Sequence, residues 1–123
     1  MQERAPGIVL LAHGSRDARW REPVEAVARR VAERAPAALV RCAYLELSQP
    51  DLRSAMAELV AAGVGSVRVV PLFLGMGKHL REDLPGLLDE LRALHPQVPL
   101  ELARAVGEEP EVLDLLARLA LKT

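Results

Sequence analysis

The fold is decided by the stretch Ile8-Val9-Leu10-Leu11-Ala12-His13-Gly14-Ser15-Arg16. Five apolar residues run directly into a histidine, and Gly14 and Ser15 then provide a turn. An apolar run of this length bounded by turn residues is typical of a strand that is covered on both faces, as in parallel sheets. Ligands bind at the carboxyl ends of such strands. The stretch therefore predicts a parallel α/β sheet with His13 at its functional edge.

Length and composition favour one globular domain spanning residues 1–123. The chain has 123 residues, half of them hydrophobic and 27% charged, which is typical of a folded domain with a single core. The net charge is −1, so no broad basic surface for nucleic acid is expected. A single cysteine, Cys42, excludes an intramolecular disulfide and is expected to be a small buried hydrophobe. We expect a cytoplasmic protein, because no apolar stretch is long enough for a membrane span and the first residues do not resemble a signal peptide.

Outward from this stretch, strands and helices alternate four times. The predicted strands cover residues 8–12, 39–44, 66–71 and 100–103. Helical spacing of apolar residues predicts helices from about 22 to 35, from a start at 48–51 with Pro50 in its first turn to the glycines at 63 and 65, from about 83 to 94, and from a start at 108–110 to 119. Pro85 is expected in the first turn of the third helix. This alternation predicts a three-layer αβα fold with right-handed crossovers around a four-stranded parallel sheet.

The polarity of the strands predicts their order in the sheet. The first and third strands are the most continuously apolar, whereas the second carries Arg41 and the fourth carries Glu101. We therefore expect the order 2-1-3-4, with the switch point between the first and third strands. A second histidine, His79, follows the third strand across the loop at 75–78. Both His13 and His79 should then border the crevice at the switch point.

Two histidines in one crevice offer an incomplete set of metal ligands. Imidazole nitrogens suit cobalt, nickel, iron or zinc, but a structural zinc site needs four protein ligands, and the sequence has no cysteine pair and no closely spaced histidine pair. A metal ion bound by His13 and His79 would keep positions for water or substrate, as an ion in transit requires. Glu46, just after the second strand, could relay protons or complete the coordination shell; it could equally be a solvated loop carboxylate.

Several motifs resemble one family in order along nearly the whole chain. They are Leu10-Leu11-Ala12-His13-Gly14-Ser15-Arg16-Asp17, Ala43-Tyr44-Leu45-Glu46, Pro50-Asp51-Leu52, Val70-Pro71-Leu72-Phe73-Leu74, Gly77-Lys78-His79 and Asp83-Leu84-Pro85. The chain resembles the short sirohydrochlorin chelatases of the CbiX type. The resemblance implies a chelatase-like fold and the ATP-independent insertion of a divalent metal ion into sirohydrochlorin, with no nucleotide. Co²⁺ on the cobalamin route is the first choice and Fe²⁺ on the siroheme route the second, while Ni²⁺ belongs to archaeal relatives.

The same resemblance implies roles for residues and for a second copy. Residues matching His13 and His79 are the metal-binding and catalytic pair of the family. Family members with one domain assemble as homodimers to build the enclosure that longer members build from two domains. A homodimer is therefore expected, although the sequence does not identify its surface.

Sirohydrochlorin is ringed by carboxylates, so cations and free backbone N–H groups near the crevice should orient it. Ser15, Arg16, Lys78 and Arg81 are placed for substrate binding, and each could equally be a loop cap or an ordinary surface charge. Trp20 could stack on the macrocycle, or it could lie in a core or interface contact.

Two other functions remain open. Phosphohistidine phosphatases and mutases also place His-Gly after a first strand, but they have arginine directly before the histidine, where this chain has Ala12. A metal or tetrapyrrole carrier would use the same two histidines without catalysing insertion. A nucleotide site is not supported, because neither a G-x-G-x-x-G pattern nor a P-loop follows the first strand.

Overall fold

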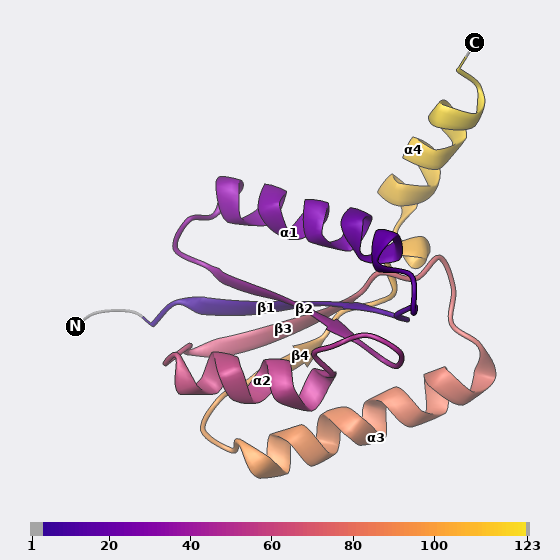
Figure 1. Ribbon diagram of the computed structural model, residues 1–123. Coiled ribbons are helices and arrows are strands. Elements are labelled where there is room, and N and C mark those ends of the chain that lie inside the picture. The colour runs from indigo at the N-terminus through magenta and orange to yellow at the C-terminus, as the bar shows by residue number, and fades with distance from the viewer. Residues whose placement is uncertain (1–3, 123) are drawn as a thin grey trace.

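The computed structural model describes residues 4–122 and contains four strands and four α-helices in strict alternation (Figure 1). The predicted domain also includes residues 1–3 and 123, which lie outside the described range. The elements are β1 (Pro6–Ala12), η1 (Ala18–Arg21), α1 (Glu22–Arg34), β2 (Leu39–Tyr44), α2 (Leu52–Ala61), β3 (Ser66–Pro71), α3 (Lys78–Leu94), β4 (Leu100–Leu102), η2 (Val106–Glu108) and α4 (Pro110–Ala120), where η denotes a 3₁₀ turn.

The four strands form one parallel sheet in the order β2-β1-β3-β4, which confirms the predicted order. Leu11 of β1 lies beside Ala43 of β2 and Pro71 of β3. The carboxyl ends of the two central strands and of β2 therefore meet at one edge, and His13 follows β1 there. This edge is the switch point, since the chain leaves β1 toward α1 on one face and leaves β3 toward α3 on the other.

The two faces of the sheet are covered unequally. Helices α2 and α3 lie on one face, and α1 lies on the other (Figure 1). The main core lies between the sheet and the helices α2 and α3, and includes Val9, Leu11, Leu59 and Leu88. A smaller cluster under α1 contains Leu10, Val24 and Tyr44. Each fully buried aliphatic side chain contributes about 1.5–3 kcal/mol of transfer free energy, so the face with α2 and α3 supplies most of the stability.

The predicted start of the third helix near Asp83 is wrong. Helix α3 begins at Lys78, with Gly77 as its N-cap, and Pro85 lies inside the helix. The proline lacks only its own N–H, so it removes one bond of the helical ladder, and its ring lies on the exposed side. Burial of Leu84, Leu88 and Leu91 on the opposite side holds the helix together through this point. His79 therefore lies in the first turn of a helix and not in a loop.

Helix α4 begins at Pro110, as predicted, but it does not cover the sheet. None of its residues is buried, and the helix extends away from the carboxyl edge of the sheet (Figure 1). Within residues 4–122, no helix is both long enough and apolar enough to cross a membrane.

Candidate functional site

His13 lies directly after β1, with its ring against the ring of Phe73. The two ring centroids are 4.5 Å apart and the ring planes are inclined by 37°. Phe73 is buried two residues after β3, so this contact joins the ends of the two central strands. The imidazole of His13 remains exposed and is free to bind a ligand.

Backbone hydrogen bonds hold the loop after β2 against the loop after β1. The N–H of Leu45 donates to the carbonyl of Ala12, and the N–H of Glu46 donates to the carbonyl of His13, each at 3.0 Å. The parallel pairing therefore continues beyond both strands. As a result the backbones of Glu46 and His13 are adjacent, although the residues are distant in sequence.

Gly14 can occupy its position only because it lacks a side chain. Its φ is +98°, and a Cβ there would lie 1.8 Å from the carbonyl oxygen of Glu46. Leu47 also has a positive φ, of 61°, which is uncommon for a residue with a side chain. The nearby Ser48 is buried; its hydroxyl donates to the carbonyl of Ser15 at 2.7 Å and accepts from the N–H of Ser15 at 3.1 Å.

His79 faces the same cleft from α3, and three further cleft residues follow it on one stripe of that helix. Asp83, Leu87 and Glu90 line the cleft at the spacing of successive helical turns. The sequence interpretation missed Asp83 and Glu90 because it started the helix after His79. A helix that starts at residue 78 places all of them on one face.

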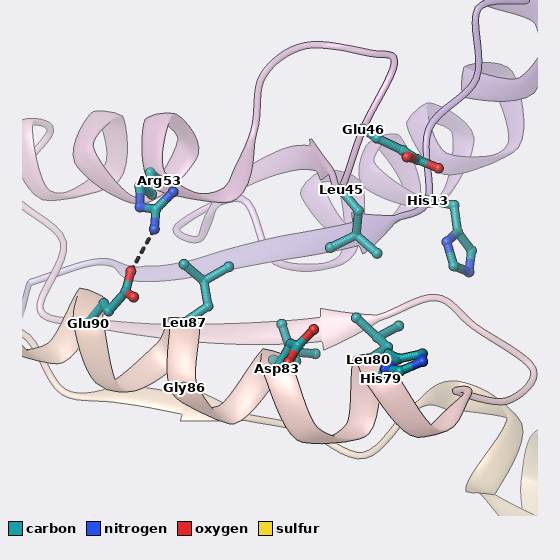
Figure 2. Close-up of a pocket in the computed structure, with 11 residues that line it drawn as sticks. His13, Leu45, Glu46, Arg53, His79, Leu80, Asp83, Gly86, Leu87 and Glu90 are labelled. Atoms are coloured by element: carbon teal, nitrogen blue, oxygen red, sulfur yellow. Dashed lines mark hydrogen bonds and ion pairs between the residues drawn. The ribbon is translucent and has the colours of Figure 1, made fainter.

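The cleft has a volume of about 740 Å³ and lies at the carboxyl edge of the sheet, between the β1 and β2 loops and α3. His13, His79 and Glu46 lie at one end of it, whereas an ion pair of 2.6 Å between Arg53 and Glu90 spans the other end (Figure 2). The lining residues are His13, Leu45, Glu46, Arg53, His79, Leu80, Asp83, Leu84, Gly86, Leu87 and Glu90. The two histidines singled out from the sequence therefore border one hollow.

The cleft carries an excess of negative charge. Glu46, Asp83 and Glu90 line it together with a single cation, Arg53, which is paired with Glu90. No salt bridge within residues 4–122 involves Glu46 or Asp83. A negatively charged cleft attracts metal cations. In the described part of the chain no three acidic, histidine or cysteine side chains are grouped closely enough to form a metal cage.

The four residues predicted to bind substrate lie outside this cleft. Ser15 lies in the loop after His13, where its hydroxyl accepts from the N–H of Asp17. Arg81 donates to the carbonyl of Met76 and forms an ion pair of 3.2 Å with Glu108. Arg16 and Lys78 are exposed, and neither lines the cleft.

A second hollow lies on the other side of His13. It has a volume of about 320 Å³, and its lining combines apolar side chains with one cation, Arg21. The lining residues are Ala12, His13, Gly14, Ser15, Trp20, Arg21, Pro23, Val24, Tyr44 and Leu72. Burial raises the pKa of the Tyr44 phenol, so this group is neutral at neutral pH. Trp20 is 71% exposed, which excludes a core role for it within one chain.

A family model described as CbiX matches residues 7–123. The sirohydrochlorin cobaltochelatase of Methanosarcina acetivorans is 33% identical over 117 residues, which cover 89% of this chain and 90% of the relative. That of Sulfolobus acidocaldarius is 28% identical, with 94% of this chain and 90% of the relative covered.

Two solved structures have the same fold. The crystal structure of a cobalamin (vitamin B12) biosynthesis CbiX protein from Marinobacter aquaeolei has a TM-score of 0.80 and 38% identity, and the match covers 94% of this chain and 93% of that one. The sirohydrochlorin chelatase SirB from Bacillus subtilis, in complex with cobalt, has a TM-score of 0.78 and 22% identity. This chain is matched over 93% of its length to only 49% of SirB.

Proposed function

The chain belongs to the CbiX family, and we propose from this premise that it inserts a divalent metal ion into sirohydrochlorin without ATP. One observation carries the proposal: His13 and His79, 66 positions apart in the numbering, line one cleft together with Glu46. The names of the relatives as sirohydrochlorin cobaltochelatases support this substrate and favour Co²⁺ as the ion, with Fe²⁺ next. We also propose that this reaction takes place in the cytoplasm, on the cobalamin or the siroheme route.

The ion is held by His13 and His79 and is drawn in by the carboxylates of the cleft. Two imidazoles leave several coordination positions for water and for the pyrrole nitrogens of the substrate. A full cage would hold the ion too tightly to release it. Glu46 lies at the histidine end of the cleft, where its carboxylate can contribute a further ligand or accept a proton.

Insertion of the ion requires the loss of two pyrrole protons from the macrocycle. The divalent ion replaces these two N–H protons, so the macrocycle loses two positive charges as it gains two. Neutral histidine and ionised glutamate are suitable acceptors. We assign the acceptors to His13, His79 and Glu46 as a group, because all three line the same end of the cleft. An imidazole has one free nitrogen lone pair, so each histidine accepts a proton only once the ion has left its nitrogen for the macrocycle.

We place the macrocycle near the second hollow and the cations around the cleft, on grounds of charge and apolar contact. Its carboxylates are repelled by Glu46 and Asp83, whereas its flat apolar surface can pack on Trp20. Arg16, Lys78 and Arg81, together with Ser15, remain our candidates for binding its carboxylates, and Arg21 joins them. In this arrangement, His13 stands between an acidic hollow for the ion and an apolar hollow for the ring.

The proposal is tested by anaerobic absorbance spectroscopy of sirohydrochlorin with Co²⁺, Fe²⁺ or Ni²⁺, in the presence of wild type, His13→Ala or His79→Ala. We expect wild type to accelerate the loss of free sirohydrochlorin, and each variant to reduce the rate to that of the uncatalysed reaction. His95→Ala is the matched control, because His95 lies at the C-terminal end of α3, away from the cleft. Retained turnover in both His13→Ala and His79→Ala would contradict the proposal.

The same assay distinguishes an enzyme from a carrier. A carrier would bind the ion or the macrocycle through the same histidines but would leave the insertion rate at the uncatalysed value. Phosphorylation of His13 would instead point to phosphoryl transfer.

A further inference from the structure

The second hollow, on the other side of His13, differs from the cleft in charge and in size. Arg21 is the one cation in its lining, and no acidic side chain of the described residues lines it. Its volume of about 320 Å³ is less than half that of the cleft, at about 740 Å³. Ligand pockets range from about 300 to 1,000 Å³, so this hollow can take one edge of a tetrapyrrole but not the whole ring.

Arg21 is a half-buried cation at the end of η1, and it forms no ion pair within residues 4–122. The other arginines in this range that lack an ion pair are all exposed. Partial burial removes water from the guanidinium group, and an anion in the hollow would replace it with strong, charge-assisted hydrogen bonds. Arg21 is therefore placed to bind an anion.

Tyr44 supplies a neutral hydrogen-bond donor to the same hollow. The residue is 3% exposed, and its hydroxyl forms no hydrogen bond to an oxygen or nitrogen atom within residues 4–122. No side-chain oxygen in this range is both enclosed and without a partner, so the hydroxyl opens into the hollow that Tyr44 lines. Burial raises the pKa of the phenol, so the hydroxyl keeps its proton at neutral pH and can donate it in a hydrogen bond.

Trp20 lies at the open side of the hollow, where its indole lines the space and remains 71% exposed. The flat face of an indole packs well against another flat conjugated ring. His13 lines both this hollow and the cleft. A macrocycle whose edge is held in the hollow therefore lies beside one of the two histidines assigned to the ion.

We propose that the second hollow is the subsite for one carboxylate arm of the macrocycle, in which Arg21 pairs with the carboxylate, the Tyr44 hydroxyl donates to it, and Trp20 covers the adjoining edge of the ring. The assignment rests on the proposed function, since it takes sirohydrochlorin as the ligand. The subsite also selects among macrocycles, because a ring without a carboxylate at this edge would leave Arg21 unpaired in the complex.

The first test is anaerobic equilibrium dialysis of metal-free sirohydrochlorin against wild type, Arg21→Gln or Arg19→Gln, with circular dichroism as the check on folding. A hydrogen bond to a charged group contributes enough that we expect Arg21→Gln to raise the dissociation constant at least about tenfold. Arg19→Gln is the matched control and should change it by less than about twofold. Arg19 belongs to the same turn, but it is 83% exposed, is paired with Asp17, and lines neither the cleft nor the hollow. Equal dissociation constants for the two variants would overturn the proposal.

Tyr44→Phe tests the second member of the subsite without changing the packing of the ring. We expect this substitution to raise the dissociation constant about threefold or more in the same dialysis, because a donor to the carboxylate is lost. An unchanged dissociation constant would remove the Tyr44 hydroxyl from the subsite.

Acetate and inorganic phosphate distinguish a subsite for an arm of the macrocycle from a site for small free anions. Both carry a charge that Arg21 could pair with, but neither has a ring for Trp20 to cover. We expect neither anion to displace sirohydrochlorin when it is present at the same concentration. Displacement at equal concentration would show that the hollow is a general anion site, and would overturn the proposal.

Binding without a metal ion separates this proposal from the chelatase reaction. If Arg21→Gln weakens binding as expected but wild type does not accelerate insertion, the subsite stands and the chelatase proposal fails. If wild type accelerates insertion and Arg21→Gln binds sirohydrochlorin as tightly as Arg19→Gln, the subsite is wrong and the chelatase proposal stands.

Discussion

The cleft has two walls that differ in how firmly they are built. The strand wall consists of His13 and Glu46 with the loops that carry them, and the helix wall consists of His79 and Asp83 on the first turns of α3. In the strand wall, backbone hydrogen bonds join the two loops and no space remains beside Gly14. In the helix wall, a Cβ at Gly77 or Gly86 would have no atom within 4 Å apart from those of its chain neighbours and of the helix backbone.

This difference suits the reaction proposed above, in which the site receives an ion and releases it. A ligand on the strand wall keeps its position, since moving it would break the hydrogen bonds that join the two loops. A ligand on the exposed first turn of a helix can shift at a smaller cost, because few contacts oppose it. We therefore expect His13 to define where the ion binds, and His79 to follow the ion as the macrocycle takes it.

The largest effect is expected for Gly14→Ala. The new Cβ would overlap the carbonyl oxygen of Glu46 at 1.8 Å, and the positive φ is unfavourable for alanine. We expect a loss of at least about 3 kcal/mol in the free energy of unfolding, measured by urea denaturation. Gly77→Ala is the control and should change that free energy by less than about 1 kcal/mol. Equal stability of the two variants would remove the contrast between the walls.

A smaller loss is expected for Ser48→Ala. The substitution leaves the N–H and carbonyl of Ser15 without the partner they have in the strand wall. Loss of a buried hydrogen-bond partner costs about 1–3 kcal/mol. The control is Ser66→Ala, since Ser66 is exposed and its hydroxyl forms no hydrogen bond within the described residues. Thermal unfolding of both variants measures the difference, and a Ser48→Ala protein as stable as the control would show that the loop is not held by this residue.

Asp51 connects the loop after Glu46 to the start of α2. Its ionisation makes the folding stability of this region depend on pH. Its carboxylate accepts from the backbone N–H of Ser54 at 2.8 Å, and this bond holds the pKa of Asp51 below its ordinary value. The folded state therefore favours the ionised form. The stabilisation is fully present above the ordinary pKa of about 3.9 and is lost as the pH falls through the lowered pKa.

We expect Asp51→Ala to reduce stability by about 1 kcal/mol at pH 7, as for other helix N-caps. The difference from wild type should shrink below about pH 4. Asp51→Asn should keep most of the cap, because asparagine accepts the same bond without ionising. Urea denaturation at several pH values measures this. If the difference in unfolding free energy between wild type and Asp51→Ala stays constant down to pH 2, ionisation of the Asp51 carboxyl does not contribute to stability.

The smallest effect, with the opposite sign, is expected for Gly86→Ala in the helix wall. Alanine is a better helix former than glycine by up to about 1 kcal/mol, and open space surrounds the new methyl group. We expect a small increase in melting temperature with the overall fold unchanged. A decrease would indicate that the helix wall is packed as tightly as the strand wall.

Much of the architecture follows from local sequence patterns. Strand polarity predicted the order 2-1-3-4, and β1 is buried on both faces, as expected of a central strand. β3 is also central, although it carries the exposed Arg68, so the polarity contrast with β2 and β4 is weaker for β3 than for β1. Pro85 misled the prediction of α3, since a proline marks a helix start more often than it lies inside a helix. That error hid Asp83 and Glu90 from the site. The closeness of Gly14 to the carbonyl of Glu46 joins two loops that are distant in sequence, so no local pattern could reveal it.

Helix α4 shows a further limit of sequence patterns. Its apolar periodicity correctly predicted a helix, but the same periodicity is produced whether the apolar side faces the core of its own chain or another molecule. In this chain the junction at Gly107, held by tertiary contacts with Phe73 and Leu74, directs the helix away from the sheet, and no local pattern encodes those contacts.

The exposed position of Trp20 has a spectroscopic consequence. The chain has one tryptophan and one tyrosine. Light at the long-wavelength edge of the aromatic absorption band excites only the indole, so the intrinsic fluorescence then comes from Trp20. That indole lines the hollow beside His13 in contact with solvent, where a coloured macrocycle settling on it would absorb its emission by energy transfer. For the proposed docking of the ring, Trp20 is therefore an optical reporter, and its quenching would follow occupancy in real time without an attached dye.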